Sequence, residues 1–151
     1  MNKQLKTIQE TATQLLKQIG IKSEIKTSEQ EGVVSVQIET QETGMLIGYH
    51  GETLNALQLM TSLIAYKKLG EWPKLVIEIG DYRQKRQEYL TSLALSAADQ
   101  VKQTNQPQHL PPMPAFERRV IHLALANDPE IETYSEGERD RHVVVGLKTK
   151  E

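Results

Sequence analysis

The sequence predicts an α+β protein made of two small domains, and three observations support this prediction. Segments with apolar residues at helical spacing are interleaved with short segments in which apolar and polar residues alternate. A loop with two glycines, Gly48-Tyr49-His50-Gly51, joins an apolar turn to a helix. A proline-rich segment, Gln106–Pro114, cannot be helical and separates two later helices.

The first domain is expected to cover residues 1–80. Its predicted elements are a helix over Asn2–Ile19, an edge strand over Ile21–Thr27, a turn over Ser28–Gly32, a strand over Val33–Glu39, a short apolar helix before Gly48, a helix over Glu52–Lys68 and a strand over Lys74–Ile79. Gly20 occupies the position that ends a helix in the left-handed conformation. Val34, Val36 and Ile38 alternate with polar residues, as in a half-buried strand. The inner stripe of the Glu52–Lys68 helix is expected to include Leu54, Leu57, Met60, Thr61 and Ile64.

The second domain is expected to cover residues 81–151. A long helix is predicted over Tyr82–Gln103, with Tyr89, Leu90, Leu93, Ala97 and Val101 on its inner face. A second helix begins near Pro114, a residue tolerated in the first turn, and ends before Asp128-Pro129. Two strands, Ile131–Tyr134 and Arg141–Leu147, follow and flank a turn. The fold expected here is two helices on a small sheet.

The composition and the apolar segments indicate in which part of the cell the protein is expected. No apolar run approaches the ~20 residues needed to cross a bilayer, and the N-terminal segment lacks the apolar region of a secretory signal. The absence of cysteine excludes disulfides, thiolate zinc sites and a cysteine nucleophile. These observations predict a cytoplasmic protein.

The charge balance is unusual for a nucleic-acid binder. The 18 basic and 20 acidic residues give a net charge of −2, whereas nucleic-acid affinity depends largely on neutralising phosphates. Neither half is basic, because residues 1–80 hold 8 basic and 9 acidic side chains and residues 81–151 hold 10 and 11. Any nucleic-acid binding is therefore expected to be modest, to use backbone amides and a few local arginines, and to be lost readily in salt.

The two-glycine loop has the properties of a phosphate-backbone clamp. Gly48 and Gly51 allow close approach of a ligand and positive φ values. The free N–H groups at the start of the following helix favour an anion. Taken alone, this pattern is more often a structural turn. Tyr49 could stack on a base, and His50 could donate to a phosphate when protonated.

The segment Leu46–Gln58 resembles the KH segment of the bacterial Jag (KhpB) family of RNA-binding proteins. This resemblance implies a type II KH domain with the order α-β-β-α-α-β. The two loop residues are usually rich in Arg or Lys in that family, whereas Tyr49 and His50 stand here. The alternative is a degenerate loop that no longer binds RNA.

The segment Pro114–Ala126 carries a second pattern. On a helix, Phe116, Val120, Leu123 and Ala124 are expected to form the apolar side, with Ile121 flanking them. Arg118, Arg119 and His122 are expected on the opposite arc. Since Arg118 and His122 are four residues apart, their side chains are neighbours and could hold an anion.

The segments Leu110–Leu125 and Ser135–Val145 together resemble the R-three-H domain, which is named for its Arg-x-x-x-His motif and associated with binding of single-stranded nucleic acid. The resemblance implies that Arg118 and His122 are the hallmark pair. A KH domain followed by an R-three-H domain resembles the C-terminal part of Jag, without the Jag-N domain. Single-stranded RNA, or single-stranded DNA, is the expected partner, together with a small KH-domain protein or a second copy of the chain.

Two further pairs of arginines are candidate phosphate contacts. Arg83 and Arg86 lie in the first turns of a helix, where the helix dipole disfavours cations. An ordinary solvated face, with pairing to Glu78 or Glu88, is the alternative. Arg139 and Arg141 lie near the last turn, with Asp140 between them.

Catalysis is not expected. His122 beside Arg118 could in principle serve an RNA phosphodiesterase, but no second histidine is placed near them by the sequence. His50, His109 and His142 form no motif, and neither metal-ligand spacing nor a cofactor motif is present. The leading hypothesis is an RNA chaperone or post-transcriptional regulator, linked by resemblance to cell elongation and division. The alternative is a protein–protein adaptor that binds RNA weakly.

Overall fold

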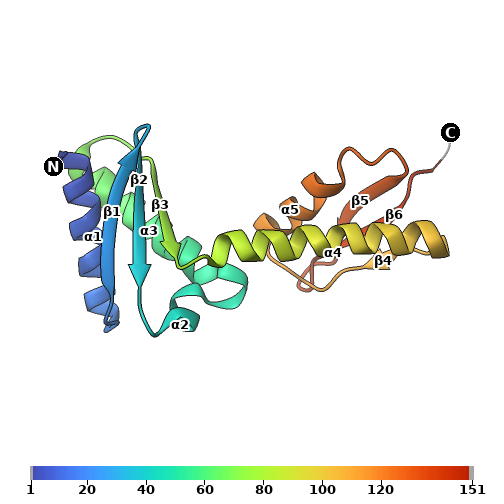
Figure 1. Cartoon of the computed structure of the whole chain (residues 1–151), viewed down its shortest axis with the longest axis horizontal. Helices are drawn as coiled ribbons and strands as arrows, with labels where there is room; N and C mark the ends of the chain where they lie inside the picture. Colours follow the sequence, from blue (N-terminus) through green and yellow to red (C-terminus); the bar gives the residue numbers. More distant parts are fainter. Residues whose placement is uncertain (1, 150–151) are drawn as a thin grey trace. The chain divides into compact units, whose positions relative to one another are not determined.

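The computed structural model describes residues 2–149, and the chain divides into two compact units at Arg83 and Gln84. Each unit combines helices with one small sheet, so the fold is α+β (Figure 1). Within residues 2–149, no helix is both long and apolar enough to cross a membrane.

The first unit has the order helix, two strands, two helices and a strand. Its elements are α1 (Lys3–Ile19), β1 (Glu24–Gln30), β2 (Val33–Glu39), α2 (Thr43–Ile47), the 3₁₀ turn η1 (Tyr49–Gly51), α3 (Glu52–Leu69) and β3 (Leu75–Ile79). The sheet has the order β1-β2-β3, with β1 antiparallel and β3 parallel to the central β2. Helices α1 and α3 pack against the sheet (Figure 1). Val34, Val36 and Ile38 of β2 belong to the core that these helices share with the sheet.

Local sequence determines the ends of α1. Asn2 is the N-cap, and its side-chain oxygen accepts a hydrogen bond from the backbone N–H of Gln4. Gly20 ends the helix with φ +86°, in the left-handed conformation that glycine adopts without steric cost. The helix boundaries expected from the sequence are confirmed to within one residue.

The second unit builds its sheet from three antiparallel strands. Its elements are most of α4 (Tyr82–Thr104), then β4 (Gln108–His109), α5 (Ala115–Leu125), β5 (Ile131–Glu136) and β6 (His142–Leu147). The strand order is β4-β6-β5, and α4 and α5 share the core with one face of this sheet. The strand β4 lies inside the proline-rich segment and was not expected, because two residues are too few to produce a pattern.

The first strand lies further along the chain than the sequence predicted. The predicted turn residues Ser28, Glu29 and Gln30 belong to β1, where they pair with Ser35, Val34 and Val33. The turn consists of Glu31 and Gly32 alone, both with positive φ. Two such residues form the tight hairpin turn that suits the twist of antiparallel strands, so the ladder continues to Gln30.

Three helix faces differ from the predictions. Met60 and Tyr89 are 47% and 54% exposed, although both were expected to point inward. On α5 the buried residues are Glu117, Ile121 and Leu125, whereas Phe116 and Leu123 are exposed. Apolar periodicity alone could not identify this face, because a carboxylate occupies one of its three buried positions.

Candidate nucleic-acid interface

The glycine loop (Gly48–Gly51) requires glycine at both ends. Gly48 has φ +70° and ψ −170°, and a Cβ there would lie 2.0 Å from the Thr53 hydroxyl oxygen. Gly51 has φ +84°, and a Cβ there would lie 3.1 Å from the Tyr82 ring. Because Gly51 is the N-cap of α3 and has no side chain, it cannot cap the first turn of that helix. Steric crowding and positive φ therefore require glycine at both positions, and this requirement is compatible with binding of a nucleic-acid backbone.

The two residues between the glycines stack on each other. The ring centroids of Tyr49 and His50 are 3.8 Å apart and the ring planes differ by 17°. His50 adopts φ +51°, in the left-handed region that non-glycine residues rarely occupy. Tyr49 is 60% exposed. The stack leaves a tyrosine surface facing solvent and supplies no fixed positive charge.

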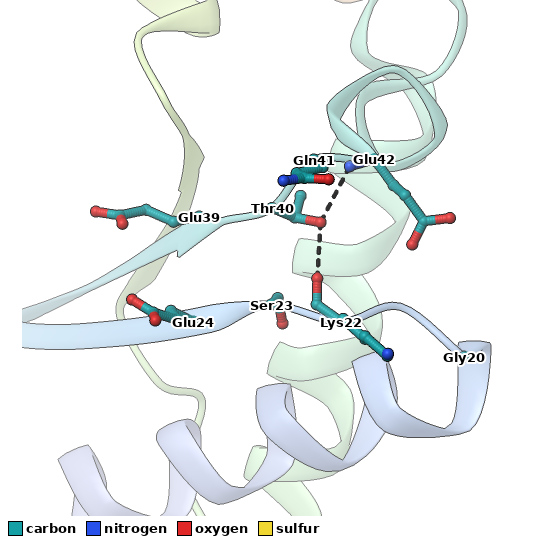
Figure 2. Close-up of a pocket in the computed structure, with 8 residues that line it drawn as sticks. All are labelled: Gly20, Lys22, Ser23, Glu24, Glu39, Thr40, Gln41 and Glu42. Carbon is teal, nitrogen blue, oxygen red and sulfur yellow. Dashed lines mark hydrogen bonds between the residues drawn. The ribbon is translucent and has the colours of Figure 1, made fainter.

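One depression in the first unit is lined mainly by acidic and polar side chains. It lies where α1 leads into β1 and β2 leads into α2, and Figure 2 shows Glu24, Glu39 and Glu42 around it, with Lys22. Thr40 closes its floor by donating a hydrogen bond to the Lys22 carbonyl (2.8 Å) and accepting one from the Glu42 N–H (3.1 Å). Glu39 is paired with Lys26 at 3.1 Å. The excess of carboxylates around the pocket makes it unfavourable for a phosphate backbone.

Arg83 is held within the first unit. Its guanidinium donates hydrogen bonds from Nε to the Ile77 carbonyl (3.2 Å) and from the two terminal nitrogens to Asn55 (3.3 Å) and Gln58 (2.9 Å). Glu78 lies 3.9 Å from Nε. Burial raises the pKa of Glu78, and the charge of Arg83 opposes that shift. These bonds join α4 to α3 and β3, and they explain Arg83 without a phosphate partner.

Arg86 forms a two-pronged ion pair with Glu117. Nε bonds Oε2, and Nη2 bonds Oε1 at 3.0 Å. The Glu117 side chain is 1% exposed and the Arg86 side chain 25%. The Arg86 guanidinium also lies 5.0 Å from the centre of the Tyr89 ring. A buried carboxylate needs a partner of this kind, so Arg86 connects α4 and α5 as a structural residue.

His122 is bonded through both ring nitrogens. Nδ1 lies 2.8 Å from the Thr133 hydroxyl and Nε2 lies 3.2 Å from the Ser135 hydroxyl, both on β5. Burial, and secondarily the charge of Arg118, lowers the pKa of His122. The lowered pKa favours the neutral imidazole, and its bonds to the two hydroxyls link α5 to β5.

The backbone of Met113 bonds the side chain of Arg118 and the backbone of Arg141. Arg118 Nε donates to the Met113 carbonyl at 3.2 Å, and the Met113 N–H donates to the Arg141 carbonyl at 3.2 Å. The Arg141 guanidinium donates to the Gly137 carbonyl at 2.9 Å and so holds the β5–β6 turn. Met113 thus joins the Arg118 side chain to the backbone of Arg141, which lies 23 positions further along the chain.

Arg119 follows Arg118 on α5, Arg139 lies two positions before Arg141 in the β5–β6 turn, and both side chains are exposed. We call the four side chains Arg118, Arg119, Arg139 and Arg141 the arginine surface. Gly137 has φ +96°, and a Cβ there would lie 2.7 Å from the Asp140 carboxylate, so the turn that carries Arg139 needs glycine. The sequence predicted the arginines but not the residues that hold them and His122 in place: Met113, Thr133, Ser135 and Glu117. Met113 acts through its backbone, Thr133 and Ser135 through their hydroxyls, and Glu117 through a buried carboxylate.

These two units match two known domain families. Residues 6–79 match the KH domain of KhpA and KhpB, and residues 88–146 match the R-three-H domain. The chain is therefore a two-domain protein of the KH and R-three-H class. Each match falls within one compact unit of the structure.

Proteins named "RNA-binding protein KhpB" resemble the chain over most of its length. The Clostridium symbiosum protein is 35% identical over 153 residues, which cover 97% of this chain and 69% of that protein. The Bacillus subtilis protein is 38% identical over 133 residues, with coverage of 86% and 64%. The Lactiplantibacillus plantarum protein is 35% identical over 136 residues, with coverage of 89% and 42%. The chain belongs to the KhpB family, whose members are named for RNA binding and not for an enzymatic activity.

Proposed function

We propose that this protein binds single-stranded RNA, with the arginine surface as the principal contact. The observation that supports this most strongly is that the Met113 backbone bonds both the Arg118 side chain and the Arg141 backbone, which links α5 to the start of β6. Arg118 uses Nε for that bond, and its terminal nitrogens have no partner among residues 2–149. A half-buried guanidinium that is held through Nε and keeps its terminal N–H groups for another acceptor is well suited to a phosphate.

The glycine loop adds a second, weaker contact in this proposal. Its glycines permit a nucleic-acid backbone to approach the start of α3, as in a KH clamp. Tyr49 offers an exposed ring for stacking on a base. With no arginine or lysine between the glycines, the loop contributes through amides and stacking and little through charge.

The assignment of functions to the two domains follows from the same reasoning. Residues 1–80 act as a KH domain and residues 81–151 as an R-three-H domain that binds single-stranded nucleic acid. The family points to an RNA chaperone or post-transcriptional regulator in the cytoplasm, connected with cell elongation and division. Of the predicted contacts, we exclude Arg83 and Arg86, because the structure gives both a structural role.

A second candidate function is that of a protein–protein adaptor, and one feature of α3 favours it. The outer face of α3 exposes Leu59, Met60, Leu63 and Tyr66. These spacings lie on one side of a helix. Such an apolar strip suits a partner, and a small KH-domain protein or a second copy of the chain is the candidate that the family suggests.

The test is fluorescence anisotropy with a labelled single-stranded RNA, titrated at two salt concentrations. Arg118→Ala is expected to weaken binding about tenfold, because a charged hydrogen bond contributes about 1.5 kcal/mol. It should also reduce the slope of log affinity against log salt by about 0.7 for one lost phosphate contact on a single strand. Single-stranded DNA of the same sequence measures the preference for ribose.

Lys148→Ala is the matched control, because it removes one exposed cation from the same unit outside the arginine surface. Gly51→Asp tests the loop separately. If Arg118→Ala behaves like Lys148→Ala, the arginine surface is not the RNA site. If the unmodified chain shows no RNA binding that depends on salt, the adaptor function replaces the proposal.

A further inference from the structure

Three potential metal ligands meet on the outer face of the second sheet. On β6, Val143 and Val145 point to the core, so His142 and Val144 point to the opposite, outer face. His142 pairs with Glu136 on β5, and Val144 pairs with His109 on β4. Since directly paired residues share a face, His109, Glu136 and His142 lie on the same side of the sheet.

Their ligand atoms are close to one another. His109 Nδ1 lies 3.0 Å from His142 Nε2 and 3.9 Å from a carboxylate oxygen of Glu136. One ligand atom from each of the three residues fits within a mutual distance of 4.8 Å. The three residues come from all three strands of the sheet, so they converge through tertiary structure alone.

The orientation of His142 is fixed by a backbone group. Its Nδ1 lies 2.9 Å from the carbonyl oxygen of Asp140, which can only accept a hydrogen bond. Nδ1 therefore carries the proton, and in the neutral ring Nε2 presents its lone pair toward His109. Metal-binding histidines are typically held in this way, with the nitrogen that does not bind metal donating to a carbonyl or carboxylate.

We propose that His109 Nδ1, His142 Nε2 and the Glu136 carboxylate bind a divalent transition-metal ion, with Zn²⁺ as the representative species. Two imidazoles and one carboxylate form a ligand set that Zn²⁺ takes in proteins. Two nitrogen ligands argue against Mg²⁺ and Ca²⁺, which prefer oxygen. The fourth position of a tetrahedral ion is open to water.

Small side-chain movements suffice to admit the ion. Zn–N bonds of about 2.0–2.1 Å in a tetrahedral site separate two nitrogens by roughly 3.3–3.4 Å, somewhat more than the 3.0 Å between His109 and His142. The side chains of His109 and Glu136 are 58% and 56% exposed, so both have room to adjust. His109 donates to His142 when no ion is bound and takes the other tautomer, with its proton on Nε2, when Nδ1 binds the metal.

The bound ion would join β4 and β5 to the central β6 on the face opposite the core that the sheet shares with α4 and α5. It would also lie next to the β5–β6 turn, because Glu136 and His142 are the last and first residues of those strands. This turn carries Arg139 and is closed by Arg141. The proposal does not depend on RNA binding, since it concerns only the ligand atoms and their spacing.

Isothermal titration of Zn²⁺ into chelator-treated full-length chain, prepared without a histidine tag, tests the proposal. One equivalent is expected to bind. His142→Ala and His109→Ala should each weaken binding by at least about tenfold, since the loss of even an indirect ligand partner costs 10–100-fold. Glu136→Gln should also weaken binding. Glu132→Gln is the matched control, because Glu132 lies on the same face of the same strand, about 13 Å away.

A second measurement identifies which ring nitrogens bind the metal ion. In ¹⁵N NMR spectra of the histidine rings, Zn²⁺ should shift Nε2 of His142 and Nδ1 of His109 and leave His122 unchanged. Binding that is unaffected by both histidine substitutions overturns the proposal. Equal affinities of Glu136→Gln and Glu132→Gln overturn the three-ligand set, and so does the absence of one-equivalent binding in the unmodified chain.

Discussion

Arg86→Ala should destabilise the second unit strongly while leaving the first unit unchanged. The substitution leaves the Glu117 carboxylate, which is 1% exposed, without its two-pronged partner. A buried carboxylate that loses this ion pair is more costly to keep charged, so it must either take up a proton or draw water between α4 and α5. Both routes destabilise the native state of that unit.

The size of the effect follows from the burial of the two groups. Removing one partner of a buried ion pair costs about 3–5 kcal/mol. Since the Arg86 side chain is 25% exposed, water partly screens the pair and the lower end, about 3 kcal/mol, is expected. A unit of this size has a total stability of about 3–10 kcal/mol. The melting temperature should therefore fall by more than about 12 °C.

Calorimetry and hydrogen exchange of β6 measure the second unit, and the fluorescence of Trp72 measures the first. Trp72 is the sole tryptophan and lies in the first unit, so its unfolding transition serves as an internal reference. Arg119→Ala is the matched control, because it removes an exposed arginine; a change within about 0.5 kcal/mol is expected. Equal effects of Arg86→Ala and Arg119→Ala would refute the reasoning.

Two further predictions concern the glycine loop and the histidine of α5. Gly48→Ala should destabilise the first unit by about 1–3 kcal/mol, because its Cβ would overlap the Thr53 side chain; urea unfolding followed by Trp72 fluorescence measures this. Gly44→Ala is the control and should have little effect, since a Cβ there meets nothing within 4 Å. Similar losses of stability in both variants would contradict the steric argument. Because burial and Arg118 lower the pKa of His122 from 6.5, the unfolded chain takes up this proton first as the pH falls. The second unit should therefore lose stability as the pH falls below about 6.5. His122→Gln should remove this part of the pH dependence of the free energy of unfolding. Parallel pH profiles of the unmodified chain and His122→Gln would show that His122 does not cause it.

Patterns along the sequence predicted most of the first unit. The alternation in Val33–Glu39 and the capping residues Asn2 and Gly20 act over a few residues, so the sequence alone reveals them. The displacement of β1 was not predictable from its own residues. Ser28, Glu29 and Gln30 have a turn-like composition, and their strand conformation comes from pairing with β2.

For the candidate nucleic-acid interface too, the sequence predicted some features and the tertiary structure supplied the others. The arginine and histidine positions were predicted, but the sequence could not distinguish the guanidinium that meets a buried carboxylate (Arg86) from the one that bonds a backbone carbonyl through Nε (Arg118). That distinction depends on Glu117, whose burial conflicts with the usual preference of carboxylates for water. His109 and His142 are 33 positions apart and show no motif spacing.

The sequence by itself determined the class of fold, the glycine loop and the family, because these depend on local periodicity, backbone freedom and short motifs. Only the tertiary structure decided which charged groups are used inside the protein and which face solvent. Burial and pairing are properties of the three-dimensional surroundings of a side chain, and residues far apart in the sequence supply those surroundings. Arg86 and Arg118 differ for this reason, although each is an arginine on an amphipathic helix.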